Sequence, residues 1–129
     1  MKATELMIGD WVSYCGFYNK VIYLGQKVSM YDGKGTEFTT DPEYIRPIPL
    51  TKEILVKSGF VEIELTDSYE LNTDYYEIEV WEFSEGLWVV KVQWIEFSMT
   101  PECKATVCYV HQLQHLLQLS GIEKELIID

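Results

Sequence analysis

The first fifty residues consist of short segments in which polar and apolar residues alternate, separated by turn signals. Asp32-Gly33-Lys34-Gly35 is a strong hairpin signal, because glycine supplies the positive φ that tight hairpins need. Residues from Lys20 to Tyr31 read as one strand bent at Gly25, and the two prolines within 44–49 favour extended backbone there. This spacing predicts four or five short strands in a small, strongly bent sheet that resembles an SH3-like barrel.

Two later segments carry helix signals. Thr51 is suited to be an N-cap and Gly59 to end a helix, so residues 52–58 are expected to form a short helix. Between residues 110 and 120 the apolar side chains form a stripe at helical spacing, and Gly121 follows. The polar side chains of that segment fall elsewhere on the helical wheel. We therefore expect a helix that lies on a sheet and turns its polar side to solvent.

Strand patterns occupy most of the remaining chain. In residues 61–65, Val61, Ile63 and Leu65 share one face and two glutamates share the other, whereas residues 67–72 read as a polar turn. Apolar residues on both faces of 87–97 are typical of a central strand covered by a helix. Further strands are expected at residues 74–83 and 104–110, with a final edge strand at 125–129.

These elements together predict an α+β fold in two parts. Residues 1–49 are expected to form a small SH3-like β lobe. Residues 50–129 are expected to form an α+β lobe, with an antiparallel or mixed sheet, one short helix and one longer helix. The sequence has no low-complexity linker between the parts, so we expect them to pack as one unit.

The charge of the chain limits its partners. The 129 residues carry 21 acidic and 10 basic side chains, a formal net charge of −11. A field of that sign repels phosphate backbones and anionic lipids, so direct binding to nucleic acid or to a membrane is not expected. The first residues lack an apolar signal core, and the three cysteines form no dense pattern. Both features predict a reduced, cytoplasmic protein.

Three segments together resemble one protein family. They are Leu6–Val12, the Pro-Ile-Pro-Leu-Thr segment from Pro47 onward with Gly59-Phe60, and Tyr-Val-His-Gln-Leu-Gln from Tyr109 onward to Gly121. The pattern is similar to that of small uncharacterised proteins of gut Bacteroidetes, their phages and mobile elements. The resemblance implies an accessory protein of phage or mobile-element origin rather than a housekeeping enzyme, and it supplies no catalytic residues.

Four residues near the C-terminus have the chemistry of metal ligands. His111 and His115 are four residues apart, so on a helix both rings could hold one zinc ion together with Cys103 or Cys108. The two cysteines lie five apart on an expected strand and point to opposite faces, and the histidines lie on the expected solvent side. In the similar family an Asn usually stands at position 115. We therefore expect no metal and keep Cys108, His111 and His115 only as weak candidates.

The chain shows no complete catalytic set. His111-Gln112-Leu113-Gln114-His115 has the histidine spacing of a zinc peptidase helix, but Gln112 cannot act as the general base. Cys15 has no identifiable base or electropositive setting. Gly33 and Gly35 belong to a hairpin and lack the helix and lysine of a phosphate-binding loop. We expect no enzymatic activity and no cofactor.

Alternating glutamates allow a carbohydrate-binding site as an alternative. Glu62, Glu64, Glu77 and Glu79 could gather on one sheet face beside Trp81, and paired carboxylates with aromatic rings occur in glycosidases and sugar-binding sheets. The simpler interpretation is that such glutamates mark the solvent face of strands. A carbohydrate-binding or metal-binding domain therefore stays a minor alternative.

Aromatic side chains give the leading hypothesis. They make up 14% of the chain and cluster in the first lobe, where a small sheet cannot bury them all. Exposed Tyr and Trp commonly anchor protein interfaces. The sequence therefore predicts a non-enzymatic protein–protein interaction module, with self-association left open. The alternative is an acidic decoy that occupies a nucleic-acid site on a host protein. The candidate anchors are Trp11, Tyr14, Tyr18 and Tyr23.

Overall fold

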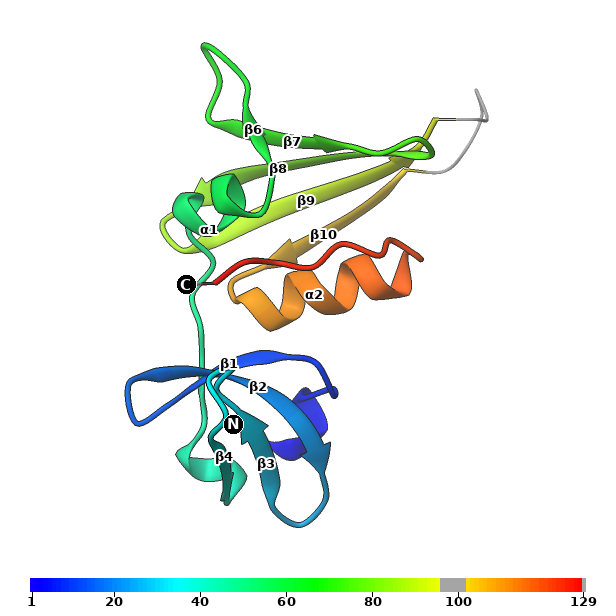
Figure 1. Ribbon diagram of the computed structural model, residues 1–129. Coiled ribbons are helices and arrows are strands. Elements are labelled where there is room, and N and C mark those ends of the chain that lie inside the picture. Colours follow the sequence, from blue (N-terminus) through cyan, green and yellow to red (C-terminus); the bar gives the residue numbers. More distant parts are fainter. Residues whose placement is uncertain (96–101, 129) are drawn as a thin grey trace.

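The computed structural model describes residues 1–95 and 102–128 and has an α+β fold with two antiparallel five-stranded sheets (Figure 1). The first sheet has the strand order β4-β3-β2-β1-β5. Its strands are β1 (Trp11–Tyr14), β2 (Phe17–Leu24), β3 (Val28–Tyr31), β4 (Glu37–Thr40) and β5 (Arg46–Pro47). Two 3₁₀ turns, η1 (Ala3–Glu5) and η2 (Pro42–Tyr44), flank this sheet.

The second sheet has the strand order β10-β9-β8-β7-β6, so every neighbouring pair follows in sequence. Its strands are β6 (Val61–Glu62), β7 (Ser68–Asn72), β8 (Tyr76–Ser84), β9 (Leu87–Trp94) and β10 (Cys103–Val107). The helices are α1 (Lys52–Lys57) and α2 (Val110–Leu119). The α+β fold with one short and one longer helix is therefore confirmed, and the second sheet is antiparallel. The SH3-like character of the first sheet stays a prediction.

The predicted helix ends are confirmed. The Thr51 Oγ1 accepts a hydrogen bond from the Ile54 backbone N–H at 3.3 Å, and Gly59 has φ +99° just after α1. At the start of α2, the Gln112 side-chain oxygen accepts from the backbone N–H groups of Cys108 (2.7 Å) and Tyr109 (3.2 Å). These bonds satisfy donors at helix starts that would otherwise have no partner.

Several strand predictions are wrong. Residues 20–31 form two strands rather than one bent strand, with Gly25 N–H donating to the Lys27 carbonyl at 3.1 Å in the turn between them. Residues 68–72, predicted as a turn, form β7, because Tyr69 is buried on its inner face despite polar neighbours. The strand predicted at 61–65 ends at Glu62, and Leu65 is fully exposed with φ +66°. Residues 125–128 form no strand, and residues 96–97 of the strand predicted at 87–97 lie outside the described residues.

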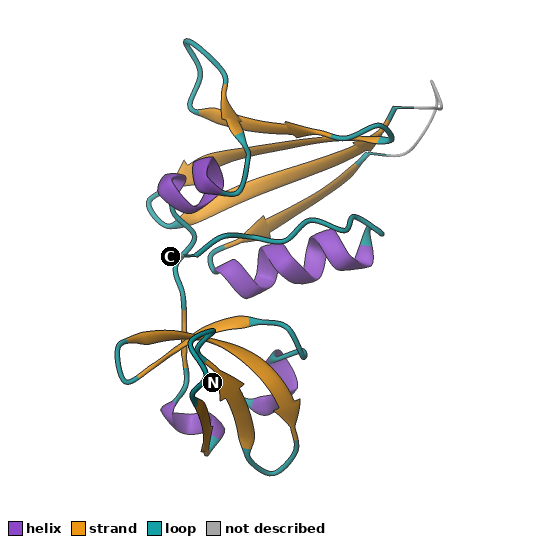
Figure 2. Cartoon of the chain, in the orientation of Figure 1, coloured by secondary structure: helices purple, strands orange, loops and turns teal. Residues whose placement is uncertain are grey.

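Two groups of buried side chains form the core. The smaller group lies within the first sheet and runs from Leu6 to Ile45. The larger group begins at Ile48 and fills the space between the second sheet, α1, α2 and the C-terminal segment. Figure 2 shows α2 lying between the two sheets. The lobe boundary between residues 49 and 50 stays a prediction. No helix among the described residues is long and apolar enough to cross a membrane.

The packing of the apolar side of α2 can be tested by mutation. Leu113 is fully buried, whereas Leu119 at the end of the same helix is 81% exposed. We expect Leu113→Ala to lower the free energy of unfolding by about 2–5 kcal/mol, because it leaves a cavity in the core. Leu119→Ala should change it by less than about 0.5 kcal/mol. Urea denaturation of both variants checks this expectation, and equal effects would contradict the placement of the helix.

Candidate functional site

Asp10 and His115 form a contact between the two lobes. Asp10 precedes β1 and is buried, and the His115 Nε2 lies 2.9 and 2.8 Å from its two carboxylate oxygens. The Met7 backbone N–H also donates to this carboxylate, at 2.8 Å. A buried carboxylate is stable only when its oxygens are hydrogen-bonded. Both oxygens are satisfied here, so the contact holds the two lobes together and leaves little acceptor capacity for a ligand.

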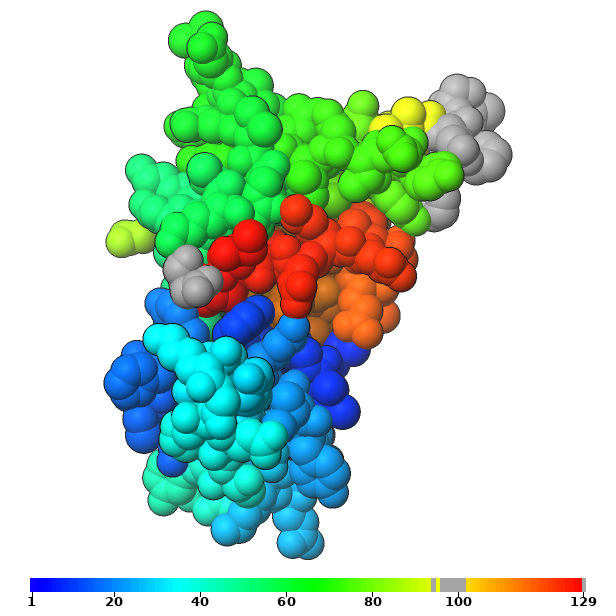
Figure 3. All heavy atoms as spheres, in the orientation of Figure 1, coloured from blue at the N-terminus to red at the C-terminus, as the bar shows by residue number. Residues whose placement is uncertain are grey.

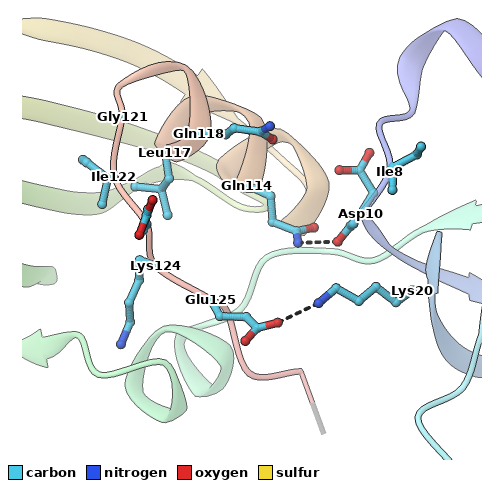
Figure 4. Close-up of a pocket in the computed structure, with 12 residues that line it drawn as sticks. Ile8, Asp10, Lys20, Gln114, Leu117, Gln118, Gly121, Ile122, Lys124 and Glu125 are labelled. Carbon is cyan, nitrogen blue, oxygen red and sulfur yellow. Dashed lines mark hydrogen bonds and ion pairs between the residues drawn. The ribbon is translucent and has the colours of Figure 1, made fainter. Parts of the chain in front are cut away.

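Gln114 adds two hydrogen bonds beside this contact. Its side-chain oxygen accepts from the Trp11 backbone N–H at 2.9 Å, and its Nε2 donates to the Gly9 carbonyl at 3.0 Å. One amide group thus pairs with the start of β1 as a neighbouring strand would. Lys20 and Glu125 form an ion pair at 2.6 Å a short distance away, also between the lobes. Figure 4 shows both connections across the same groove.

A groove between the lobes has a volume of about 650 Å³. Its walls come from the residues before β1, from α2 and from the segment that follows Gly121. The C-terminal segment lies over this junction in the space-filling view (Figure 3). Asp10, Lys20, Gln114 and Glu125 are all partnered within the chain. These four polar side chains connect the two lobes across the groove.

The predicted exposure of the α2 histidines is wrong. His111 is only 4% exposed, and His115 is half-buried by its contact with Asp10. The first lobe covers the side of α2 that the sequence pattern marks as polar. His111 lies between Tyr109, whose ring is stacked on it at 5.9 Å, and His115, whose ring is 5.5 Å away.

The weak metal candidates do not come together as ligands. His115 is engaged by Asp10, Cys108 is half-buried, and Cys103 is exposed on β10. Within residues 1–95 and 102–128, no three Asp, Glu, His or Cys side chains lie close enough to hold a metal ion.

A second hollow lies beside the β1–β2 hairpin, which projects to the left of the first sheet in Figure 1. It has a volume of about 350 Å³ and is more apolar than polar. We call it the aromatic hollow; its lining residues are Trp11, Phe17, Tyr18, Asp32, Lys34, Phe38 and Ile128. Phe17 is 71% and Tyr18 46% exposed. Phe17 and Tyr18 are consecutive in β2, and exposed apolar residues that lie together, rather than singly, are typical of an interaction surface.

The four predicted anchors divide among different places. Trp11 and Tyr18 line the aromatic hollow, although Trp11 also packs on the larger core. Tyr14 packs on the core of the first sheet and meets Phe38 edge to face at 5.9 Å. Tyr23 is 61% exposed and lies away from the hollow, against Gly25.

Sequence reasoning missed two members of the aromatic hollow, Phe17 and Phe38. Phe17 is opposite Tyr14 across the β1–β2 hairpin, and Phe38 is opposite Met30 in the β3–β4 pair. The hairpin pairing that places Phe17 beside the predicted anchors is set by the turn at Gly16, which has φ +81°. Gly16 in the sequence could therefore have predicted this hairpin and the pairing of Phe17 with Tyr14.

The predicted row of glutamates does not form. Glu77 and Glu79 alternate with buried residues of β8, so they lie on the face away from α2. Glu62 is paired directly with Tyr69 and shares its face of the sheet, which is the face opposite to that of Glu77 and Glu79. Glu64 lies in the exposed loop that follows β6. The carboxylates are thus divided between two faces of the sheet.

Comparison with known proteins finds no family model, no curated protein and no solved structure that matches the chain.

The amide of Gln114 gives a test of the lobe junction. We expect Gln114→Ala to lower the free energy of unfolding by about 1–3 kcal/mol, because the Trp11 N–H and the Gly9 carbonyl lose their partner. Gln118→Ala, an exposed position one turn further along α2, should have almost no effect. Chemical denaturation measures both, and a silent Gln114→Ala would show that the amide is not part of the junction.

His111 gives a pH dependence. Burial lowers the pKa of His111 below the ordinary value of 6.5, and His115 lowers it further, while Asp10 and Glu5 oppose the shift. The folded protein therefore binds this proton less readily than the unfolded chain, so its stability falls as the pH drops below about 6.5. His111→Phe keeps an aromatic ring and removes the titration.

We expect the loss of stability between about pH 7 and about pH 5.5 to be smaller in His111→Phe than in the original protein. Urea denaturation at the two pH values measures the difference. An identical loss in both would mean that His111 does not carry the effect.

Proposed function

We propose that the protein is a non-enzymatic interaction module that binds a protein partner through the aromatic hollow. The observation that carries the proposal is the exposure of Phe17 and Tyr18 at the rim of an apolar hollow. Aromatic side chains provide a large contact area at a small cost in conformational entropy, and they dominate the energetics of many interfaces.

The size of the hollow supports a side chain as its occupant. Ligand and cofactor pockets have volumes of roughly 300–1,000 Å³, and the aromatic hollow, at about 350 Å³, lies near the lower limit. That space suits one large apolar side chain of a partner. Asp32 and Lys34 at the rim provide polar contacts around it, as expected of the polar border of an interface.

The charge of the chain and its resemblance narrow the kind of partner. A net charge of −11 favours a neutral or basic protein surface. The similarity to small proteins of phages and mobile elements supports a cytoplasmic bacterial partner. The second candidate function is an acidic decoy of a nucleic-acid site, and the net charge is its support. The two functions differ in how their complexes respond to salt, because screening weakens charge contacts far more than apolar burial.

The test is a pull-down from nuclease-treated bacterial lysate, washed at about 0.1 M and about 1 M salt. We expect one stoichiometric partner that survives both washes and that is lost with Phe17→Ala/Tyr18→Ala. The matched control is Tyr75→Ala/Phe83→Ala, which removes two similarly exposed aromatic residues, one from the turn before β8 and one from β8. This control should keep the partner.

Two results would contradict the proposal. A partner that is kept by Phe17→Ala/Tyr18→Ala at high salt does not use the aromatic hollow. A partner that is lost from the original protein at high salt favours the acidic decoy. Mass spectrometry of the bound fraction distinguishes these results.

A further inference from the structure

The second sheet is covered on one face only within the described parts of the chain. Both helices and the larger core lie against that face (Figure 2). The opposite face, which we call the outer face, carries the side chains of β7 to β10 that alternate with the buried ones, and all of these are half-buried or exposed. An antiparallel sheet can leave one face to solvent, so the pattern of side chains decides whether the outer face is an interface.

Charged side chains form one row across the outer face. The register of β7 to β10 places Glu70, Glu79, Lys91 and Lys104 side by side in that order. Among the described residues, the two glutamates have no ion-pair partner. Glu102 lies 3.4 Å from Lys91 and 3.1 Å from Lys104, so one positive charge stays in excess there. The two halves of the outer face therefore carry opposite charge.

A less polar row lies beside the charged one. It consists, in the same strand order, of Ser68, Trp81, Val89 and Thr106. Trp81 and Val89 are both half-buried and adjacent at the middle of the row. Tryptophan is enriched in protein interfaces and is among the residues that contribute most to their affinity.

We propose that the outer face binds the outer face of a second copy of the chain, in a symmetric dimer whose two-fold axis runs parallel to the strands. Such an axis reverses the order of the strands and keeps each row in place, so β8 lies over β9 of the second copy. Glu79 then faces Lys91 of the second copy, and Trp81 faces Val89 of the second copy. The proposal is independent of the aromatic hollow, which uses other residues.

The charges select this orientation over the other symmetric one. A two-fold axis in the plane of the sheets and perpendicular to the strands would place each strand over itself. Glu79 would then face Glu79 and Lys91 would face Lys91, and like charges that face each other oppose association. The order of two acidic and two basic residues is complementary to itself only when the strand order is reversed.

A small hollow on the acidic half supports the same orientation. It has a volume of about 110 Å³, and three carboxylates line it, those of Glu70, Glu77 and Glu79. In the proposed dimer, Lys104 of the second copy lies over Glu70, at the border of this hollow. The Lys104 side chain is 57% exposed, and its ammonium group would relieve the repulsion among the three carboxylates.

The size of the outer face indicates a weak dimer. Strands about 4.8 Å apart with a rise of about 3.3 Å per residue give a face of roughly 500 Å² per copy for four strands of the length of β9. Two copies would bury about 1,000 Å² in total, which is near the lower limit for a specific interface. The net charge of −11 on each copy also opposes association. We therefore expect the dimer to form at high protein concentration.

The test is sedimentation velocity of the full chain over a roughly hundredfold range of concentration. We expect the average mass to rise from that of one copy toward that of two. Trp81→Ala and Glu79→Lys should each weaken association roughly tenfold or more. The matched control is Glu37→Lys, which makes the same change of charge on β4 of the first sheet, and it should keep the dimer.

An exchange of charges gives a sharper test. Lys91→Glu alone should weaken the dimer as Glu79→Lys does, because each variant places like charges opposite one another twice. The double variant Glu79→Lys/Lys91→Glu should dimerise again, since opposite charges face each other once more. It should not form mixed dimers with the original protein, in which like charges would meet. A fluorescent label on one of the two proteins measures the mixed dimer.

The mixed dimer also separates contact between copies from effects within one copy. Glu79 and Lys91 are paired across β8 and β9 of the same chain, so recovery by the double variant alone could arise within one copy. Rejection of the original protein can arise only between copies. If Glu79→Lys/Lys91→Glu fails to fold, Glu70→Lys/Lys104→Glu repeats the exchange on the outer two strands.

Four outcomes would overturn the proposal. The first is a single copy at every concentration. The second is equal weakening by Glu37→Lys and Glu79→Lys, which would assign the effect to net charge. The third is a doubly exchanged variant that forms mixed dimers as readily as dimers with itself. The fourth is a dimer that Trp81→Ala keeps and Phe17→Ala/Tyr18→Ala removes, because that dimer would use the aromatic hollow.

Discussion

Helix α2 is packed on two sides, and the relation between the two sheets depends on it. One side places its leucine stripe into the larger core. The other side presents Gln114 and His115 to the chain around β1, where they bind backbone groups and a buried carboxylate. A helix in this position is apolar on one side and forms specific hydrogen bonds on the other, since both of these sides pack against the rest of the chain.

The backbone reinforces this arrangement at the start of α2. Pro49 pairs with Tyr109 in an isolated antiparallel bridge, and the chain around them exchanges two hydrogen bonds, Leu50 N–H to Cys108 carbonyl and Val110 N–H to Ile48 carbonyl. The segment that connects the lobes is thus held directly against the start of the helix. This short pairing fixes where α2 begins relative to both sheets, and the side-chain contacts further along the helix set its rotation.

The sequence predicted the parts of the fold that depend on local signals. The two helices, the Thr51 cap and the glycines that end the helices are encoded within a few residues, and so is the hairpin at Asp32–Gly35, where β3 and β4 pair antiparallel. The capping of α2 by Gln112 was not predicted. It did not predict the covered histidine side of α2, because an amphipathic pattern does not say what lies on its polar side. It also missed β7, since only Tyr69 of that segment is fully buried and its neighbours are polar.

The candidate sites were predictable to a lesser degree. The excess of aromatic residues in the first lobe predicted an interaction surface on that lobe. The pairing of the β1–β2 hairpin, which brings Phe17 opposite Tyr14, decides which aromatic residues form it. The glutamates were read as one row by their alternation, whereas β6 is too short to continue that row and turns Glu62 toward Tyr69. Residues that come together from several elements, such as those of the aromatic hollow, leave no periodic trace in a sequence.

The order of the chain has a consequence for its synthesis on the ribosome. The first sheet is complete once Pro47 has been made, whereas Gln114 and His115, which satisfy the Trp11 N–H and Asp10, are made far later. Until then the Asp10 carboxylate is open to water and one side of β1 is uncovered. The nascent first sheet is therefore a different molecular surface from the finished one, because the Trp11 N–H at the start of β1 and the Asp10 carboxylate have no partner from α2 until that helix emerges.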